Sequence, residues 1–445
     1  MPRRGIPRAA AFLFCAASLV GESPAADWTQ FRGPGGLGRA NEAQAPATWN
    51  AFRNLVWSTP LPGSGCSSPV VIGDRIWLTT AETTALTTEQ LRQRAQDAEF
   101  PLDDFQVHQS VALFALELDG KSGRVLRRIR LFAHDSPPAI HVWNHYASPT
   151  PAADDRQLYC HFGALGTAAI RWQTGEIAWQ QRLAVDDATG PGSSPIVWRE
   201  RLFLACDGRD KQFVVALDVH TGKELWKTAR PPIEASDEMH RRAFSTPIVV
   251  PDGDGESLVS VGAQWLVAYD PLTGREKWKV NFGTGYSIVP MPGYRDGLLF
   301  ACTGYPKPQL WAVRTGGTGD VTDSHVAWIY DRQVPELSSP LAVDEQIYLA
   351  SLSGVLACLD AKTGAKLWQQ RVGGSFHASP IAVGNHVYFV DRDGTTTVVK
   401  AGREYQVMGT GQAAGIHQAT PAVYNHGLLL RSSEGLYFVR TNNSP

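Results

Sequence analysis

The sequence predicts an all-β fold, an eight-bladed β-propeller of four-stranded antiparallel blades. Three observations carry this prediction. Apolar runs of strand length alternate with turn residues along most of the chain, long helical patterns are scarce, and one pattern recurs every 40 to 52 residues after a first step of 80. A single four-stranded meander cannot bury its apolar face, whereas copies stacked around a ring bury each other's faces.

The first 26 residues are expected to be a secretory signal peptide. Arg3, Arg4 and Arg8 give a basic start, and the apolar run at 9–20 is too short to span a bilayer as a helix. Small residues follow at 23–25, as at a cleavage site. We therefore expect an exported protein, periplasmic or extracellular, with no transmembrane segment after cleavage.

The charge balance excludes one class of partner. The formal net charge is −2 and the pI is near 6.6. Nucleic-acid binding depends on clustered Lys and Arg, so no nucleic-acid partner is expected. The expected partner is a small molecule or an envelope protein, and the chain is expected to be a monomer.

The cysteines are expected to be buried free thiols. Five remain after signal cleavage, an odd number, and no CxxC motif occurs. Most lie within or at the end of apolar strand runs, where a free thiol acts as a small apolar group. The five are Cys66, Cys160, Cys206, Cys302 and Cys358.

A Ser/Thr-Pro pair marks the start of the first strand in most copies of the repeat. Proline is tolerated there because the first residue of a strand need not donate a ladder hydrogen bond. The pairs are Ser68-Pro69, Ser148-Pro149, Ser194-Pro195, Thr246-Pro247, Ser339-Pro340, Ser379-Pro380 and Thr420-Pro421, and a degenerate copy begins at Met291-Pro292.

A second signature, Thr-Gly-x-x-x-Trp, joins the third and fourth strands. Thr can close the turn locally and Gly can supply a positive φ. The tryptophan then lies on the outer strand, where we expect it to dock each blade on the next. These tryptophans are Trp179, Trp226, Trp278 and Trp368, and Arg127 takes the equivalent position in blade one.

The ends of the repeat array predict how the ring closes. The last copy stops one strand short, whereas residues 55–61 form an outer-strand sequence with no blade of their own. We expect this N-terminal strand to complete blade eight, which removes open sheet edges. Residues 27–54 then form an N-terminal extension and residues 55–445 a single propeller, with an insertion at 81–110 in blade one that contains a short helix.

These signatures resemble those of the pyrroloquinoline-quinone (PQQ) repeat propellers, over residues 55–440. That group includes the quinoprotein dehydrogenases and the outer-membrane-assembly propeller lipoprotein. The opening Asp27-Trp-Thr-Gln-Phe-Arg-Gly-Pro34 is similar to that of secreted, planctomycete-type PQQ-like propellers. The resemblance implies the propeller fold, and that subfamily is described by its repeats without an established activity.

The chain departs from the quinoprotein alcohol dehydrogenases. The family pattern implies adjacent cysteines against the quinone, an aspartate base and a calcium site. This chain has no Cys-Cys pair, and no stretch matches the calcium and base region. We therefore predict no cofactor, with PQQ kept as the alternative.

Residues just before each first strand are expected to face one mouth of the central channel. Aromatic residues could stack a flat or sugar-like ligand there, while His and Gln give polar contacts. Ordinary packing is the competing interpretation. The candidates are His145, Tyr146, Phe244, Phe376, His377, His417 and Gln418, with Arg209 from a charged turn as a contact for an acidic ligand.

Metal binding is not predicted. His141 and His145 lie four residues apart, but prolines bracket the segment, so a helical pair is not expected. The run 252–256 has the composition of half a calcium loop, but Asp-Gly also predicts a hairpin turn there.

The sequence therefore favours a non-enzymatic, extracytoplasmic binding scaffold with no catalytic residues. One alternative is a PQQ-dependent oxidoreductase. The other is an assembly factor for cell-envelope proteins.

Overall fold

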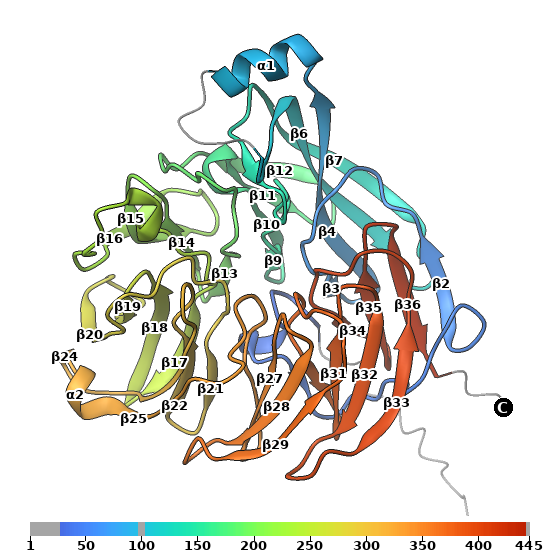
Figure 1. The fold of residues 1–445 in the computed structure, drawn as a ribbon. Helices are drawn as coiled ribbons and strands as arrows, with labels where there is room; N and C mark the ends of the chain where they lie inside the picture. Colours follow the sequence, from blue (N-terminus) through green and yellow to red (C-terminus); the bar gives the residue numbers. More distant parts are fainter. Residues whose placement is uncertain (1–26, 97–102, 442–445) are drawn as a thin grey trace, which may run out of the picture.

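The structure, a computed structural model, describes residues 27–96 and 103–441. Eight small antiparallel sheets form a ring, and Figure 1 shows the blades following one another around it. The prediction of an eight-bladed β-propeller is therefore confirmed. The expected signal peptide and part of the blade-one insertion lie outside the described residues.

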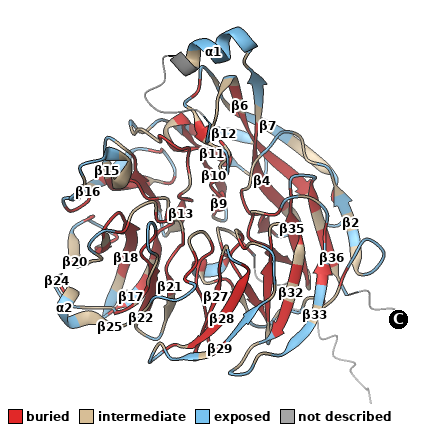
Figure 2. Ribbon diagram, in the orientation of Figure 1, coloured by how far each residue is buried: buried red, intermediate tan, exposed pale blue. Residues whose placement is uncertain are grey.

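Each blade has three inner strands and one outer strand, and the inner strands are the more deeply buried (Figure 2). Blades one to four consist of β3 (Val70–Ile72), β4 (Arg75–Ala85), β6 (His108–Asp119) and β7 (Val125–Asp135); β9 (Ala152–Ala153), β10 (Gln157–His161), β11 (Thr167–Arg171) and β12 (Glu176–Gln181); β13 (Ile196–Trp198), β14 (Arg201–Asp207), β15 (Gln212–Asp218) and β16 (Glu224–Ala229); and β17 (Ile248–Asp252), β18 (Gly255–Gly262), β19 (Trp265–Tyr269) and β20 (Glu276–Asn281).

The other four blades repeat this arrangement. They consist of β21 (Gly293–Arg295), β22 (Leu298–Cys302), β23 (Leu310–Arg314) and β25 (Val326–Tyr330); β26 (Leu341–Val343), β27 (Gln346–Ala350), β28 (Val355–Asp360) and β29 (Lys366–Arg371); β30 (Ile381–Val383), β31 (His386–Val390), β32 (Thr395–Lys400) and β33 (Val407–Gln412); and β34 (Ala422–Tyr424), β35 (Gly427–Arg431), β36 (Leu436–Arg440) and β2 (Leu55–Thr59).

The N-terminal strand closes the ring as predicted. β2 pairs antiparallel with β36 and supplies the outer strand of blade eight. Its Trp57 donates a hydrogen bond of 3.0 Å to the carbonyl oxygen of Gly120 in blade one. The two ends of the propeller are thus joined within one sheet, and that sheet is docked on the next.

The same docking recurs between other blades. Trp179 donates to the carbonyl oxygen of Val219 at 2.8 Å and lies against Gly222 of the next blade, which has a φ of 70°. Arg127, at the tryptophan position of blade one, instead donates to two carbonyl oxygens in the corresponding turn of blade two. Trp278 differs, because its indole donates to the Asp252 carboxylate within its own blade.

The Ser/Thr-Pro pairs form a belt of buried hydroxyls around the channel. The backbone N–H of Ser339 donates to the Ser379 hydroxyl at 2.9 Å, and that of Ser379 donates to the Thr420 hydroxyl at 3.0 Å. Four more such links join successive blades, namely Ser68 to Thr150, Thr150 to Ser194, Ser194 to Thr246 and Met291 to Ser339. These six links give buried N–H groups at the inner edge a partner from the neighbouring blade.

The hydrogen bonds of the belt show that blade two begins two residues later than predicted. Its member there is Thr150, and β9 begins directly after Pro151, as the first strand begins after the proline in the other blades. The prediction that blade two begins at Ser148-Pro149 is therefore wrong by two residues. Two Ser/Thr-Pro pairs in succession cannot be told apart by spacing alone.

Substitution of Ser339 by alanine is expected to lower the free energy of unfolding by about 1–3 kcal/mol, because it leaves the buried N–H of Met291 without an acceptor. Chemical denaturation measures the change. Ser68→Ala is the matched control, since the equally buried Ser68 hydroxyl has no hydrogen-bond partner among the described residues. Equal losses in both variants would contradict a stabilising role for the belt.

The N-terminal extension closes one end of the channel. Trp28 exchanges backbone hydrogen bonds with Val71 of blade one, and the Arg32 guanidinium donates to the Pro340 carbonyl oxygen of blade six at 2.9 Å. β1 (Arg39–Ala40) then pairs in parallel with β30 of blade seven. Figure 1 shows this blue segment crossing the centre of the ring. It contacts the first strands downstream of the Ser/Thr-Pro belt, so the opposite end is the one left open.

Blade one is longer than the others because its insertion continues the sheet. β4 and β6 pair as far as Ala85 and His108, and α1 (Thr88–Gln96) follows β4. A two-stranded pairing of β5 (Phe105–Gln106) with β8 (Ile140–His141) ties the insertion to the segment that leads into blade two. In the described ranges, no helix has the length and hydrophobicity needed to cross a membrane.

Short elements complete the fold. β24 (Gly319–Asp320) and α2 (Thr322–His325) belong to the stretched turn of blade five, and β24 pairs in parallel with β20 of blade four. The 3-10 helices are η1 (Pro34–Gly36), η2 (Gly163–Leu165) and η3 (Glu238–Arg241). The five described cysteines are all free thiols, and four of them are buried.

Candidate functional site: a cavity at the open mouth

Two kinds of connection lie on one face of the ring, which we call the loop face. They are the loops between the second and third strands of each blade and the segments that lead from one blade into the next. Antiparallel strands alternate in direction, so both kinds of connection end on the same side. Two cavities lie on this face, and the N-terminal extension lies at the other end of the channel.

The larger one, which we call the mouth cavity, has a volume of about 210 Å³. Its walls come from blades seven and eight and from the segments leading into blades eight, one and two. None of the described residues that line it is acidic. The lining residues are Leu61, Gly63, Ser64, Gly65, Cys66, Val142, Trp143, His145, Arg392, Ile416, Gln418, Ala419, Arg431, Ser432 and Ser433.

Arg431, at the end of β35, is the deepest charge of the mouth cavity. The residue is only 3% exposed, and its Nη1 donates to the carbonyl oxygen of Ser67 at 2.9 Å and to the hydroxyl of the same serine at 2.5 Å. Among the described residues no carboxylate pairs with it. Burial lowers the pKa of Arg431 to about 10, so the guanidinium remains charged at neutral pH. A buried cation with only neutral partners is costly unless an anion is near.

Arg392 adds a second positive charge. It follows β31 in blade seven, is half-buried, and its guanidinium makes no ion pair within the described part of the chain. Burial, and then the nearby Arg392 charge, lowers the pKa of His377 to about 4. The His377 ring is therefore neutral at physiological pH, and its centroid lies 5.9 Å from that of Trp143.

His145 and Gln418, two of the predicted mouth residues, meet in the mouth cavity. The His145 Nε2 lies 3.2 Å from the Gln418 Oε1, and the Gln418 amide donates to the Trp143 carbonyl oxygen at 3.1 Å. Burial lowers the pKa of His145, so it acts as a neutral hydrogen-bonding group. This contact joins the segments that lead into blades two and eight and fixes Trp143, which is 56% exposed, at the rim.

Three other predicted residues lie in the core. The Tyr146 hydroxyl donates to the Pro138 carbonyl oxygen at 2.7 Å, and the residue is 2% exposed. Phe376 packs against Phe389, and His417 is buried beside the Ala414 carbonyl oxygen. None of the three lines either cavity. For Tyr146 the reason is the register of blade two, which places this residue two positions further from the first strand.

Phe244 and Arg209 lie on the loop face but away from the mouth cavity. Phe244 lines the smaller cavity, beside Arg242. Arg209 forms an ion pair with Asp186, with Nη2 2.8 Å from the carboxylate oxygen. Its charge is thus matched within the loop and differs from the charges of Arg392 and Arg431.

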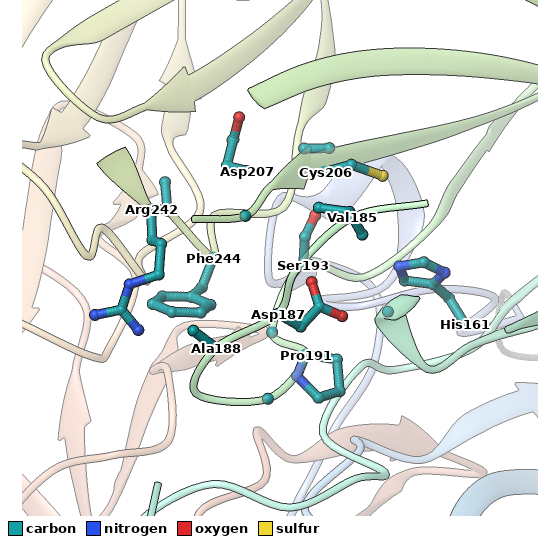
Figure 3. Close-up of a pocket in the computed structure, with 16 residues that line it drawn as sticks. His161, Val185, Asp187, Ala188, Pro191, Ser193, Cys206, Asp207, Arg242 and Phe244 are labelled. Carbon is teal, nitrogen blue, oxygen red and sulfur yellow. The ribbon is translucent and has the colours of Figure 1, made fainter. Parts of the chain in front are cut away.

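The smaller cavity, which we call the Asp187 cavity, has a volume of about 20 Å³ and can hold a water molecule but no substrate. Figure 3 shows Asp187, Ser193 and His161 around it. The Asp187 carboxylate lies over Gly163 and accepts a 2.5 Å hydrogen bond from the N–H of Ala164. Burial raises the pKa of Asp187 to about 6 and lowers that of His161 to about 4.

The predicted turn at 252–256 is present between β17 and β18. The Asp252 carboxylate lies 2.8 Å from the Lys277 ammonium nitrogen and also accepts from Trp278. His141 packs on Phe105 and Trp143, and His145 points to Gln418. Within the described ranges, no group of three His, Cys, Asp or Glu side chains is placed to hold a metal.

The sequence interpretation missed the two arginines of the mouth cavity. Arg431 ends the apolar strand Gly427–Arg431, where a charged residue is seldom buried. Arg392 occupies the corresponding loop one blade earlier. Arg431 is the last residue of its second strand, whereas Arg392 lies two residues beyond its own, so repeat spacing does not align the two.

A family model described as outer membrane protein assembly factor BamB matches four overlapping ranges of the chain. These are 48–227, 112–264, 210–344 and 262–443, which together cover nearly all of the propeller.

Two curated relatives show how the similarity is distributed. The chain is 24% identical over 252 residues to outer membrane protein assembly factor BamB of Yersinia pestis, covering 53% of this chain and 58% of that protein. It is 21% identical over 342 residues to tetrathionate hydrolase of Acidithiobacillus ferrooxidans, covering 65% of this chain and 63% of that protein. The chain thus matches less than two thirds of the length of either relative.

Solved structures share the fold. BamB from Moraxella catarrhalis has a TM-score of 0.57 at 16% identity, covering 88% of this chain and 98% of that one. Quinohemoprotein alcohol dehydrogenase from Comamonas testosteroni has a TM-score of 0.58 at 12% identity, covering 94% of this chain and 82% of that one.

Proposed function

The chain belongs to the family described as outer membrane protein assembly factor BamB, and on that premise we propose that it is a non-enzymatic, extracytoplasmic binding propeller. Its ligand enters the mouth cavity on the loop face. The observation that carries this proposal is the pairing of one blocked channel end with an open, positively charged cavity at the other.

The geometry of the mouth cavity supports binding. It combines an exposed aromatic rim residue, Trp143, with fixed hydrogen-bonding groups and two arginines that form no ion pair with any described residue. Pockets of this composition orient ligands through a few polar groups. The residues come from blades that lie far apart in the sequence, so the folded ring assembles the site.

The residues present do not fit PQQ in the mouth cavity. PQQ is a fused tricyclic cofactor, and a volume of about 210 Å³ is below the roughly 300–1,000 Å³ of pockets that enclose small ligands. The described residues that line the cavity include no carboxylate, so they offer neither an acidic calcium ligand nor an aspartate base to a molecule bound there. We therefore derive no oxidoreductase chemistry for this site.

Envelope assembly is a second candidate, supported by the family match and by an apolar part of the loop face. Leu91, on α1 of the blade-one insertion, is 45% exposed, and Val142, which follows the strand β8 that pairs with this insertion, is 41% exposed. Exposed apolar residues of this kind can contact another protein. In this proposal a partner chain covers the blade-one insertion (residues 81–110) and places one of its chain ends in the mouth cavity.

A fragment screen tests the binding proposal. Neutral, cationic and anionic fragments are expected to slow alkylation of Cys66 by iodoacetamide, because this half-buried thiol lines the mouth cavity while the other described cysteines are buried. Mass spectrometry of the Cys66 peptide measures the rate. Trp143→Ala should raise the fragment concentration needed to protect Cys66 about tenfold, because the aromatic contact is lost. Tyr305→Ala, at an equally exposed aromatic outside the cavity, should leave it unchanged.

The same preparation tests the alternative cofactor. Addition of PQQ with calcium is expected to give no saturable absorbance change at high micromolar concentration. Saturable PQQ binding that Trp143→Ala abolishes would contradict the proposal. Failure of every fragment to protect Cys66 would also contradict it.

A further inference from the structure

We propose that the mouth cavity recognises a carboxylate group, with Arg431 as the residue that binds it. This inference rests on the proposed function and specifies the chemical class of its ligand.

The Arg431 guanidinium has one occupied nitrogen and one free edge. Nη1 is held by the Ser67 carbonyl and hydroxyl oxygens. Nε and Nη2 have no hydrogen-bond partner among the described residues. Neither atom is fully buried, so a ligand in the cavity can reach both. These two nitrogens form a planar edge with two N–H groups. Such an edge matches the two oxygens of a carboxylate.

The surroundings hold this edge in place. Gly65 lies so close that a Cβ there would be 2.9 Å from Nη2, and its φ of 158° is one that other residues seldom adopt. Glycine at this position therefore leaves room beside the guanidinium. Ser67 is fully buried, so its two hydrogen bonds fix the plane of the group.

The charge of the cavity is uncompensated. Arg392 lines the same cavity and makes no ion pair within the described chain, and the described lining residues include no Asp or Glu. By contrast, Arg230 and Arg209, in other loops of the same face, each pair with an aspartate. Arg392 and Arg431 therefore lack the carboxylate partner that Arg230 and Arg209 have among the described residues. The neutral His145 and Gln418 provide hydrogen bonds beside the charge without competing for it.

A matched pair of probes tests the carboxylate class. N-acetyl-L-alanine and its amide have nearly the same size and shape but differ in charge. The acid is expected to slow Cys66 alkylation and to give saturation-transfer NMR signals at tenfold lower concentration than the amide. An acetylated heptapeptide ending in alanine, compared with its amide, then distinguishes a peptide C terminus from a small free acid.

Variants assign the effect to the arginines. Arg431→Gln should weaken binding of the acid about ten- to hundredfold, as expected for loss of a charge-assisted bidentate contact, and leave the weak binding of the amide unchanged. Arg392→Gln should weaken it less. Arg209→Gln is the control, because that arginine is paired with Asp186 outside the cavity. If Arg431→Gln fails to fold, Arg392→Gln and the acid–amide pair still decide the result.

The outcomes separate the two proposals. Equal protection of Cys66 by acid and amide, or by inorganic phosphate and acid, would overturn the carboxylate inference and leave the binding function intact. No protection by any probe would overturn both. Preference for the acid that survives in both arginine variants would also contradict the assignment to Arg431.

Discussion

Replacement of Asp207 by alanine is expected to destabilise the propeller by roughly 3–5 kcal/mol, the largest effect predicted for a single side chain. Asp207 ends β14 and receives two hydrogen bonds from Arg230, from Nε at 2.9 Å and from Nη2 at 2.6 Å. Both side chains are 2% exposed. Burial alone would lower the pKa of Arg230, but the Asp207 carboxylate more than offsets burial and raises it. The variant leaves this cation buried without a counter-ion.

The control for this prediction removes both charges. Asp207→Leu with Arg230→Met retains apolar volume, so the double variant should recover most of the loss. The midpoints of urea denaturation at neutral pH compare the three proteins. A double variant as unstable as Asp207→Ala would show that hydrogen bonds to Ser260, which Arg230 also makes, matter more than the charge pair.

The second large effect is a pH-dependent stabilisation by Asp187→Asn. Burial raises the pKa of Asp187 to about 6 in the folded protein, whereas an unfolded aspartate titrates near 3.9. Its protonated form therefore stabilises the fold fully below about pH 4, and this contribution is lost as the pH rises through 6. A difference of this size corresponds to roughly 3 kcal/mol. Asparagine can still accept the Ala164 hydrogen bond and carries no charge at any pH.

Melting temperatures at pH 4 and pH 7.5 test this effect. Asp187→Asn should melt higher than the native protein at pH 7.5 and within error of it at pH 4. Asp186→Asn, at the neighbouring carboxylate that pairs with Arg209, is the matched control and should not be stabilising at pH 7.5. A gain for Asp187→Asn that is the same at both pH values would rule out titration as the cause.

The repeat pattern predicted most of the scaffold because its residues act locally. Thr-Gly turns and outer-strand tryptophans recur at fixed spacing, and the structure places Trp179 and Trp226 on carbonyl groups of the following blade. The closing strand was predictable for a related reason, since residues 55–61 fit an outer strand and the last copy lacked one.

The mouth cavity was less predictable because its contacts join distant parts of the chain. Arg431 binds Ser67, 364 residues away, and His145 meets Gln418, 273 residues away. Spacing within one repeat does not define such contacts. The closure of one channel end by the N-terminal extension was missed for a different reason. Trp28 and Arg32 lie outside the repeats, and their contacts with the blades follow no regular sequence pattern.

A crystal structure of the protein soaked with N-acetyl-L-alanine tests the central claim most directly. We predict the acid in the mouth cavity, with its carboxylate oxygens within hydrogen-bond distance of Nε and Nη2 of Arg431 and its methyl group toward Trp143. An ordered acid bound elsewhere, with the mouth cavity free of it at saturating concentration, would contradict the account.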